Sequence, residues 1–279
     1  MRLRCLAPGK VNLSLYVGAP RADGLHPLVS VVQPVSLADE LTLEPARGAA
    51  ADEVVCPGVD GDNLAGSALA VFRAATGWDA PPQRLTIAKR VPVAAGMGGG
   101  SGDAAAALRL AAHAAGIDDP ELLLGLAARL GGDVPSQVAP GRTLMTGAGE
   151  HVRALGPAGR LALVILPSEH GLSTPAVYRE FDRLGAQRSP EELAELEALG
   201  GDAPVHNDLQ DAARSLCPPI DEALEAVAAT GAGPVLVSGS GPTVFGLYED
   251  TERARAAAAE VGGVFAEPVD AGFGAVREA

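Results

Sequence analysis

The sequence predicts a protein of two domains in which strands and helices are mixed. A chain of 279 residues can bury one large core or two smaller ones, and this length favours two domains. Hydrophobic residues make up 47% of the chain and charged residues 20%, a balance that is typical of a globular protein. Turn residues cluster at 156–159, so we expect one domain over residues 1–156 and a second over residues 157–279.

The first domain begins with segments that alternate or run apolar in the manner of strands. Strands are expected over residues 2–6, 12–17, 28–35, 39–44, 84–90, 142–146 and 150–154. A Pro-Gly turn at 7–10 and an Asp-Gly turn at 23–24 should separate the early strands. Cap residues before apolar series, and glycines after them, predict helices over 62–75, 103–115 and 120–130. The first has Asp62 or Asn63 as its cap and ends before Gly77, and the third has Asp119 as its cap and ends before Gly131.

The second domain has the same mixture in shorter elements. Strands are expected over residues 161–167, 234–238 and 243–248 and near 264, with a glycine-rich turn at 238–242. Helices are expected over 174–184, 207–216, 219–230 and 252–261, and an acidic, solvated helix face over 191–197.

Charge and composition restrict the partners. The formal net charge of −14 argues against nucleic acid and anionic membranes, because both demand a basic surface. The longest aliphatic run, 161–166, is too short to span a bilayer, and the N-terminus lacks the apolar core of a signal peptide. The three cysteines have no metal-binding or disulfide pattern. We therefore expect a cytoplasmic enzyme with a small-molecule substrate, acting as a monomer or homodimer.

One stretch, Pro92 to Asp103, dominates the first half. Four of its glycines lie within five residues and lead directly into an alanine-rich helical series. Glycine lets backbone N–H groups turn toward a large anion where a helix begins, which favours a phosphate loop over a merely flexible one. The stretch has no lysine, so it is not a P-loop, and its glycine spacing does not fit a dinucleotide fingerprint.

Three segments, 7–12, 92–105 and 237–244, together resemble the three signature motifs of the GHMP kinases. This superfamily is named after galactokinase, homoserine kinase, mevalonate kinase and phosphomevalonate kinase. Met97 stands at the position of a leucine in its middle motif. The resemblance implies the α+β GHMP kinase fold, with an ATP-binding N-terminal half like ribosomal protein S5 domain 2 and a ferredoxin-like C-terminal half.

Further segments resemble one branch of that superfamily. They are residues 8–13, 21–26, 132–135 and 238–243, and the Arg-Ala-Asp-Gly-Leu-His segment at 21–26 is the discriminating one. This branch uses ATP to phosphorylate the 2-hydroxyl of a methylerythritol carried on cytidine diphosphate, a step of the non-mevalonate isoprenoid pathway. The alternatives are another GHMP kinase, of the mevalonate or homoserine type, and a nucleotide-binding module without catalysis.

The resemblance also implies roles for single residues. Asp133 would be the general base and Lys10 its electrostatic partner, although by residue type alone Asp133 is a helix N-cap and Lys10 a turn lysine. Asp103 is either a carboxylate near a phosphate-bound Mg²⁺ or a helix cap. Mg²⁺ is expected to come with ATP, and no metal site built by the protein alone is expected.

The remaining implied contacts fall into two groups. Those to ATP are Pro92, Val93, Ala94, Ala95, Gly96, Met97, Gly98, Gly99, Gly100, Ser101 and Gly102, with Lys89 and Asn63 near the adenine and ribose. Those to the acceptor substrate are Asn12, Leu25, His26 and Tyr178. Leu25 stands where the branch usually has an aromatic residue, so it offers apolar contact without stacking. Gly102 replaces a small polar residue, so no hydroxyl reaches phosphate from that position.

Overall fold

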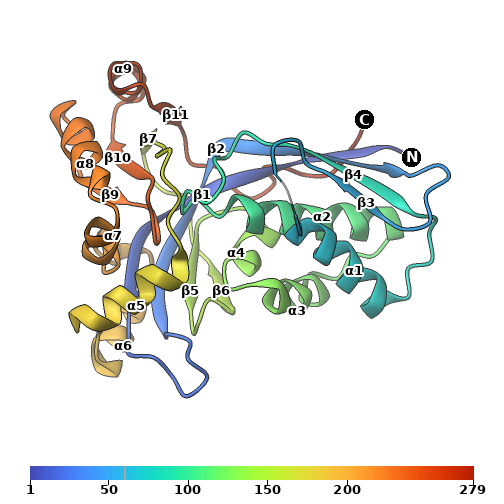
Figure 1. Ribbon diagram of the computed structural model, residues 1–279, viewed down its shortest axis with the longest axis horizontal. Coiled ribbons are helices and arrows are strands. Elements are labelled where there is room, and N and C mark those ends of the chain that lie inside the picture. Colours follow the sequence, from blue (N-terminus) through green and yellow to red (C-terminus); the bar gives the residue numbers. More distant parts are fainter. Residues whose placement is uncertain (60) are drawn as a thin grey trace.

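A computed structural model describes residues 1–59 and 61–279. Within these residues the strands form one sheet of eight strands and one of four, which lie side by side with helices packed against each (Figure 1). The mixture of helix and sheet that the sequence predicts is confirmed.

The large sheet has the strand order β12-β1-β2-β4-β3, and β5 and β8 join it at β2 and β1. Its strands are β1 (Leu3–Val17), β2 (Leu28–Pro45), β3 (Glu53–Val55), β4 (Gln83–Ala88), β5 (Thr143–Thr146), β6 (His151–Ala154), β8 (His206–Asn207) and β12 (Arg277–Glu278). The short strands β3, β8 and β12 carry too few residues to show a periodic pattern, and the sequence did not predict them.

The strand β1 corrects one expectation. It runs without a turn through residues 7–10, where a Pro-Gly turn is predicted, and β2 likewise runs through both of its predicted strands. The pairing register of β1 and β2 shifts between Pro8 and Lys10 and again between Asn12 and Ser14. Such irregularities accommodate proline and glycine within a strand, because they bend it and leave a backbone group unpaired.

Four helices cover one face of the large sheet. They are α1 (Leu64–Thr76), α2 (Gly99–Ala115), α3 (Pro120–Leu130) and α4 (Val134–Val138). Asn63, one of the two candidate caps of α1, and Asp119, the predicted cap of α3, each accept a hydrogen bond from the backbone of the first turn. In contrast, α2 begins at Gly99 rather than at Asp103, since Gly98 adopts the left-handed conformation that starts it.

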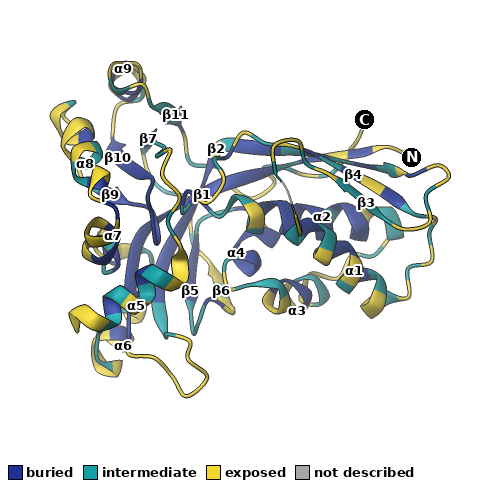
Figure 2. Ribbon diagram, viewed as in Figure 1, coloured by how far each residue is buried: buried dark blue, intermediate teal, exposed yellow. Residues whose placement is uncertain are grey.

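The helix α2 is the most central of these. Ten of its residues are buried, most of them alanines that let the helix approach β1 closely, and Figure 2 shows it largely dark blue. The outer faces of the C-terminal helices are exposed in the same view. The phosphate-loop candidate therefore leads into a helix whose residues are mostly buried.

The small sheet has the order β11-β7-β10-β9, with antiparallel pairing throughout. Its strands are β7 (Ala162–Leu166), β9 (Val235–Val237), β10 (Val244–Tyr248) and β11 (Val264–Ala266). The helices of this half are α5 (Thr174–Leu184), α6 (Pro190–Leu199), a short 3₁₀ turn η1 (Gly200–Asp202), α7 (Gln210–Leu216), α8 (Pro219–Ala229) and α9 (Thr251–Val261). The start of α7 is later than predicted because residues 206–207 pair with β1 instead.

The two sheets share one apolar cluster, in which Val11 and Val31 of the large sheet pack with Ile165 and Phe245 of the small one. The C-terminal half also supplies β8 and β12 to the large sheet. The boundary between residues 156 and 157 stays a prediction. No helix in the described ranges is both long and apolar enough to cross a membrane.

Candidate active site

The glycine loop, residues 92–98 before α2, is shaped by close contact with the glycine-rich turn at 238–242. Gly96 and Gly98 have φ angles of 72° and 64°, which favour glycine. A Cβ on Gly96 would lie 2.3 Å from the carbonyl oxygen of Ser238, so no other residue fits there without moving the turn. The Ser238 hydroxyl donates to the Gly96 carbonyl at 3.1 Å. Residues 238–241 therefore pack directly against the glycine loop.

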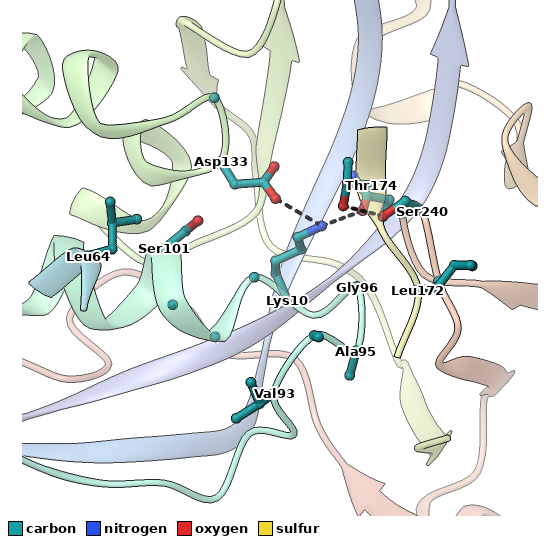
Figure 3. Close-up of a pocket in the computed structure, with 18 of the residues that line it drawn as sticks. Lys10, Leu64, Val93, Ala95, Gly96, Ser101, Asp133, Leu172, Thr174 and Ser240 are labelled. Carbon is teal, nitrogen blue, oxygen red and sulfur yellow. Dashed lines mark hydrogen bonds and ion pairs between the residues drawn. The ribbon is translucent and has the colours of Figure 1, made fainter. Parts of the chain in front are cut away.

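A cavity of about 650 Å³ opens where the loop, β1 and the two halves meet. Predicted site residues that line it are Lys10, Asn12, Asn63, Lys89, Pro92, Val93, Ala94, Ala95, Gly96, Gly98, Gly99, Gly100, Ser101, Asp133 and Tyr178. Figure 3 shows Lys10 and Asp133 between Leu64 and Ser101 on one side and Thr174, Ser240 and Leu172 on the other. The cavity therefore has two ends with one ion pair between them.

Lys10 and Asp133 form that ion pair. The Lys10 Nζ atom lies 3.5 Å from Asp133 Oδ2, and Lys10 is only 3% exposed (Figure 3). Asp133 occupies the N-cap position of α4, but its carboxylate makes no capping hydrogen bond and is 40% exposed. This carboxylate is thus free to accept a proton from a bound alcohol, as the general-base hypothesis requires.

A chain of hydrogen bonds orients Lys10. Its ammonium donates to Asn12 Oδ1 at 2.7 Å, and Asn12 Nδ2 donates to the Ser30 hydroxyl at 2.8 Å. The Ser30 hydroxyl in turn donates to the backbone carbonyl of Ser14 at 2.6 Å. Because all four residues are buried and come from the paired strands β1 and β2, the ammonium has little freedom to move.

Lys89 is held by two carboxylates. Its Nζ atom donates to Asp103 Oδ2 at 2.8 Å and to Asp39 Oδ2. Burial raises the pKa of Asp103 to about 7, even though Lys89 acts to lower it. Burial lowers the pKa of Lys89, but the two carboxylates outweigh that effect and hold it above its ordinary value. The capping interpretation of Asp103 is wrong, because its side chain is buried against Lys89.

Two loop positions lie outside the cavity lining. Met97 is 1% exposed and packs in the shared apolar cluster. Gly102 faces β1, where a Cβ would lie 3.1 Å from the Pro8 carbonyl oxygen. A hydroxyl at position 102 would therefore meet β1 rather than phosphate, which corrects the expected consequence of that glycine.

Some of the residues predicted to contact the acceptor substrate line the cavity, and others lie outside it. Leu25 is 53% exposed in its turn and lies outside the lining. His26 also lies outside it, since its Nε2 atom pairs with Asp182 Oδ1 at 2.9 Å. The His26 ring packs against Tyr178, with centroids 4.9 Å apart, and Tyr178 does line the cavity. Burial, with a smaller effect of the Asp133 carboxylate, raises the pKa of Tyr178, so its hydroxyl stays protonated.

The sequence missed three polar residues at the site. Asp39 stands at the start of the predicted strand 39–44, beside Glu40, so the sequence did not indicate that the structure buries it completely. Ser30 and Thr174 gave no signal either. Thr174 lines the cavity, and its hydroxyl lies 2.8 Å from that of Ser240.

Comparisons with known proteins agree with this site. The GHMP kinase N-terminal domain matches residues 63–141, and the GHMP kinases C-terminal family matches residues 178–267. Fold and site thus define a GHMP-type small-molecule kinase.

Curated relatives narrow the class. The chain is 44% identical over 278 residues to the 4-diphosphocytidyl-2-C-methyl-D-erythritol kinase of Streptomyces avermitilis, covering 92% of each chain. It is 42% identical over 277 residues to the enzyme of the same name from a Nocardioides species, again covering 92% of each. The chain therefore belongs to the GHMP kinases and, among them, to the family of the 4-diphosphocytidyl-2-C-methyl-D-erythritol kinases.

Solved structures give the same result. A crystal structure of 4-(cytidine 5'-diphospho)-2C-methyl-D-erythritol kinase matches with a TM-score of 0.77 at 36% identity, covering 96% of this chain and 100% of that one. A homoserine kinase from Cytophaga hutchinsonii matches with a TM-score of 0.72 at 15% identity, covering 99% and 96% of the two chains. The second likeness shows the fold alone.

Proposed function

We propose that this chain transfers the γ-phosphoryl group of ATP to the 2-hydroxyl of 4-diphosphocytidyl-2-C-methyl-D-erythritol. The observation that carries the proposal is the Lys10–Asp133 ion pair in the middle of the cavity, between the glycine loop and the residues of α5. Phosphoryl transfer needs positioning, charge neutralisation and an acceptor for the hydroxyl proton. The pair and the loop can supply all three.

The nucleotide would occupy the end of the cavity that α1 and α2 form. Asn63, Leu64, Lys89 and Ser101 line this end. Within the described residues no side chain caps the first turn of α2, so its backbone N–H groups are available to phosphate oxygens. The helix dipole adds about 0.3–2 kcal/mol to the binding of an anion there.

The acceptor alcohol would occupy the other end, near Tyr178 and Thr174. Its hydroxyl would approach Asp133, which accepts the proton as the oxygen attacks phosphorus. Lys10 stabilises the charge that develops between the two substrates, and Asn12 keeps its ammonium in place. An acceptor that extends past Tyr178 would bring its cytosine end to Leu25 and His26, which would contact it.

Mg²⁺ is expected with ATP, where it would neutralise charge on the phosphates. Among the residues described, no three His, Cys, Asp or Glu side chains gather to hold a metal. An ion that keeps several waters and binds phosphate oxygens needs few protein ligands, and the Ser101 hydroxyl lies within the cavity to provide one. One chain supplies the whole cavity, so a monomer or a homodimer in the cytoplasm would each carry a complete site.

Substrate-dependent release of ADP tests the proposal. We expect turnover with 4-diphosphocytidyl-2-C-methyl-D-erythritol and none with mevalonate or homoserine. The Asp133→Asn variant should lose about 10²–10⁴ in kcat, because it removes the proton acceptor and the partner of Lys10. ATP binding should stay within about twofold, because the glycine loop is unchanged. Asp118→Asn, an exposed carboxylate outside the cavity, is the matched control. Turnover near that of the wild type in Asp133→Asn would refute the assignment of the base.

A further inference from the structure

A second cavity, of about 430 Å³, lies between β1 and the C-terminal segment 272–277. It shares no lining residue with the catalytic cavity. Three arginines, Arg4, Arg90 and Arg277, line it, and Glu40 is the one acidic residue in its described lining.

Two of these arginines are placed against each other. Arg4 of β1 and Arg277 of β12 are register partners in an antiparallel pair, so their side chains leave the sheet on the same face. Like charges directly opposite in a sheet destabilise it. Within the described ranges, none of the three cavity arginines forms an ion pair, although the chain carries 35 acidic residues against 21 basic ones. All three side chains are exposed, so their guanidinium groups are open to a ligand from solution.

A fourth guanidinium lies directly behind the cavity wall. Arg109 of α2 is buried and donates to the carbonyl oxygens of Gly274 at 2.6 Å and Leu6 at 2.9 Å, and both of these residues line the cavity. Its Nε atom is buried without a partner, and no carboxylate pairs with it among the residues described. A buried guanidinium without a counter-charge is costly, and an anion in the cavity would offset that cost.

We infer that this cavity is a binding site for a small molecule that carries a diphosphate group. Arginine binds phosphoryl oxygens through two parallel N–H groups, and three guanidiniums around one cavity suit two linked phosphoryl groups. The site is separate from the catalytic cavity, so evidence for or against it does not affect the proposed kinase reaction.

Isothermal titration with inorganic pyrophosphate tests the site. The catalytic cavity is first saturated with a non-hydrolysable ATP analogue, so that the glycine loop cannot take up the probe. We expect the wild type to bind one pyrophosphate under these conditions. The double variant Arg4→Gln/Arg277→Gln should bind it at least about tenfold more weakly, because two charge-assisted contacts are lost.

The matched control is Arg2→Gln/Arg84→Gln, which also removes two positive charges. Arg2 and Arg84 pair with Glu44 and Glu53 and lie outside the cavity, so the affinity should stay within about twofold of the wild type. Thermal unfolding without pyrophosphate checks the fold of Arg4→Gln/Arg277→Gln, whose midpoint should not fall, since a like-charge pair has been removed. Absence of binding to the wild type, or an equal loss in both double variants, would overturn the inference.

Discussion

Replacing Lys89 by methionine tests the contacts that tie both ends of the glycine loop to β2. The Lys89 ammonium bonds to Asp103 on α2 and to Asp39 on β2, and the three side chains are 14%, 3% and 0% exposed. Asp39 also accepts hydrogen bonds from the backbone N–H groups of Arg90 and Val91, where the loop begins. Methionine keeps most of the volume of lysine and removes its charge.

The expected loss of stability follows from what each carboxylate retains. Asp39 keeps its two backbone donors, whereas Asp103 loses its hydrogen bond to Lys89, and its Oδ1 atom is already buried without a partner. Removing one member of a buried ion pair costs about 3–5 kcal/mol. We expect a loss of about 3 kcal/mol in the free energy of unfolding of Lys89→Met at pH 8. The loss should be smaller at pH 6, where a proton can neutralise Asp103.

Urea unfolding measures this loss. Trp78, the one tryptophan of the chain, packs edge-on against Phe72 at the end of α1 and reports on this half by fluorescence, while circular dichroism follows the whole chain. Lys89→Met/Asp103→Asn should recover at least about 1–2 kcal/mol, because the unpaired carboxylate is gone. Arg84→Met is the control, since Arg84 forms an exposed pair on β4, the strand that precedes Lys89, and should change stability by about 0.5 kcal/mol or less.

The result that refutes this reasoning is specific. If Lys89→Met unfolds with a loss below about 1 kcal/mol while the KM for ATP rises, Lys89 acts on the nucleotide and not on the loop. That outcome would favour the role near adenine and ribose that the sequence predicts.

Three further predictions concern the loop and its helix. The folded-state pKa of Asp103, about 7, lies above its ordinary 3.8, so the folded chain binds the extra proton and this group's contribution to stability falls as pH rises from about 4 to about 7. The free energy of unfolding of Asp103→Asn, measured in urea, should therefore increase relative to that of the wild type as pH rises from 5 to 8. Gly96→Ala should raise the KM for ATP by about tenfold or more in a steady-state assay, because its Cβ would collide with the Ser238 carbonyl. Gly102→Ser should leave that KM within about twofold and lower the thermal midpoint, since the new side chain meets the Pro8 carbonyl.

Each of these has a contrary result. If the free energy of unfolding of Asp103→Asn changes with pH in parallel with that of the wild type, the Asp103 carboxyl titrates normally. An unchanged KM in Gly96→Ala would mean that the loop adjusts without loss of phosphate binding. A lower KM in Gly102→Ser would show that a hydroxyl at this position does reach the nucleotide.

The sequence was sufficient wherever the signal lies within a few residues. Asn63 and Gly77 bound α1, and Asp119 and Gly131 bound α3, as the caps predict. The glycine stretch before an alanine-rich helix was enough to predict an anion site. Local signals failed at residues 7–10, where proline and glycine predict a turn but pairing with β2 over the whole strand outweighs it.

The tertiary structure decided which charges meet. Lys10 and Asp133 could be paired from sequence only through family resemblance, because no local pattern relates residues so far apart, and the fold places their atoms 3.5 Å from each other. The partners of Lys89 lie 14 and 50 positions away, and nothing near Lys89 in the sequence indicates them. By itself, then, the sequence determined most of the helices, the glycine loop and the family, but not the starts of α2 and α7 or the short helix α4. Only the packing of β1, β2 and α2 decided which side chains face the cavity and which are held behind it, because buried charges must find partners wherever the fold brings them.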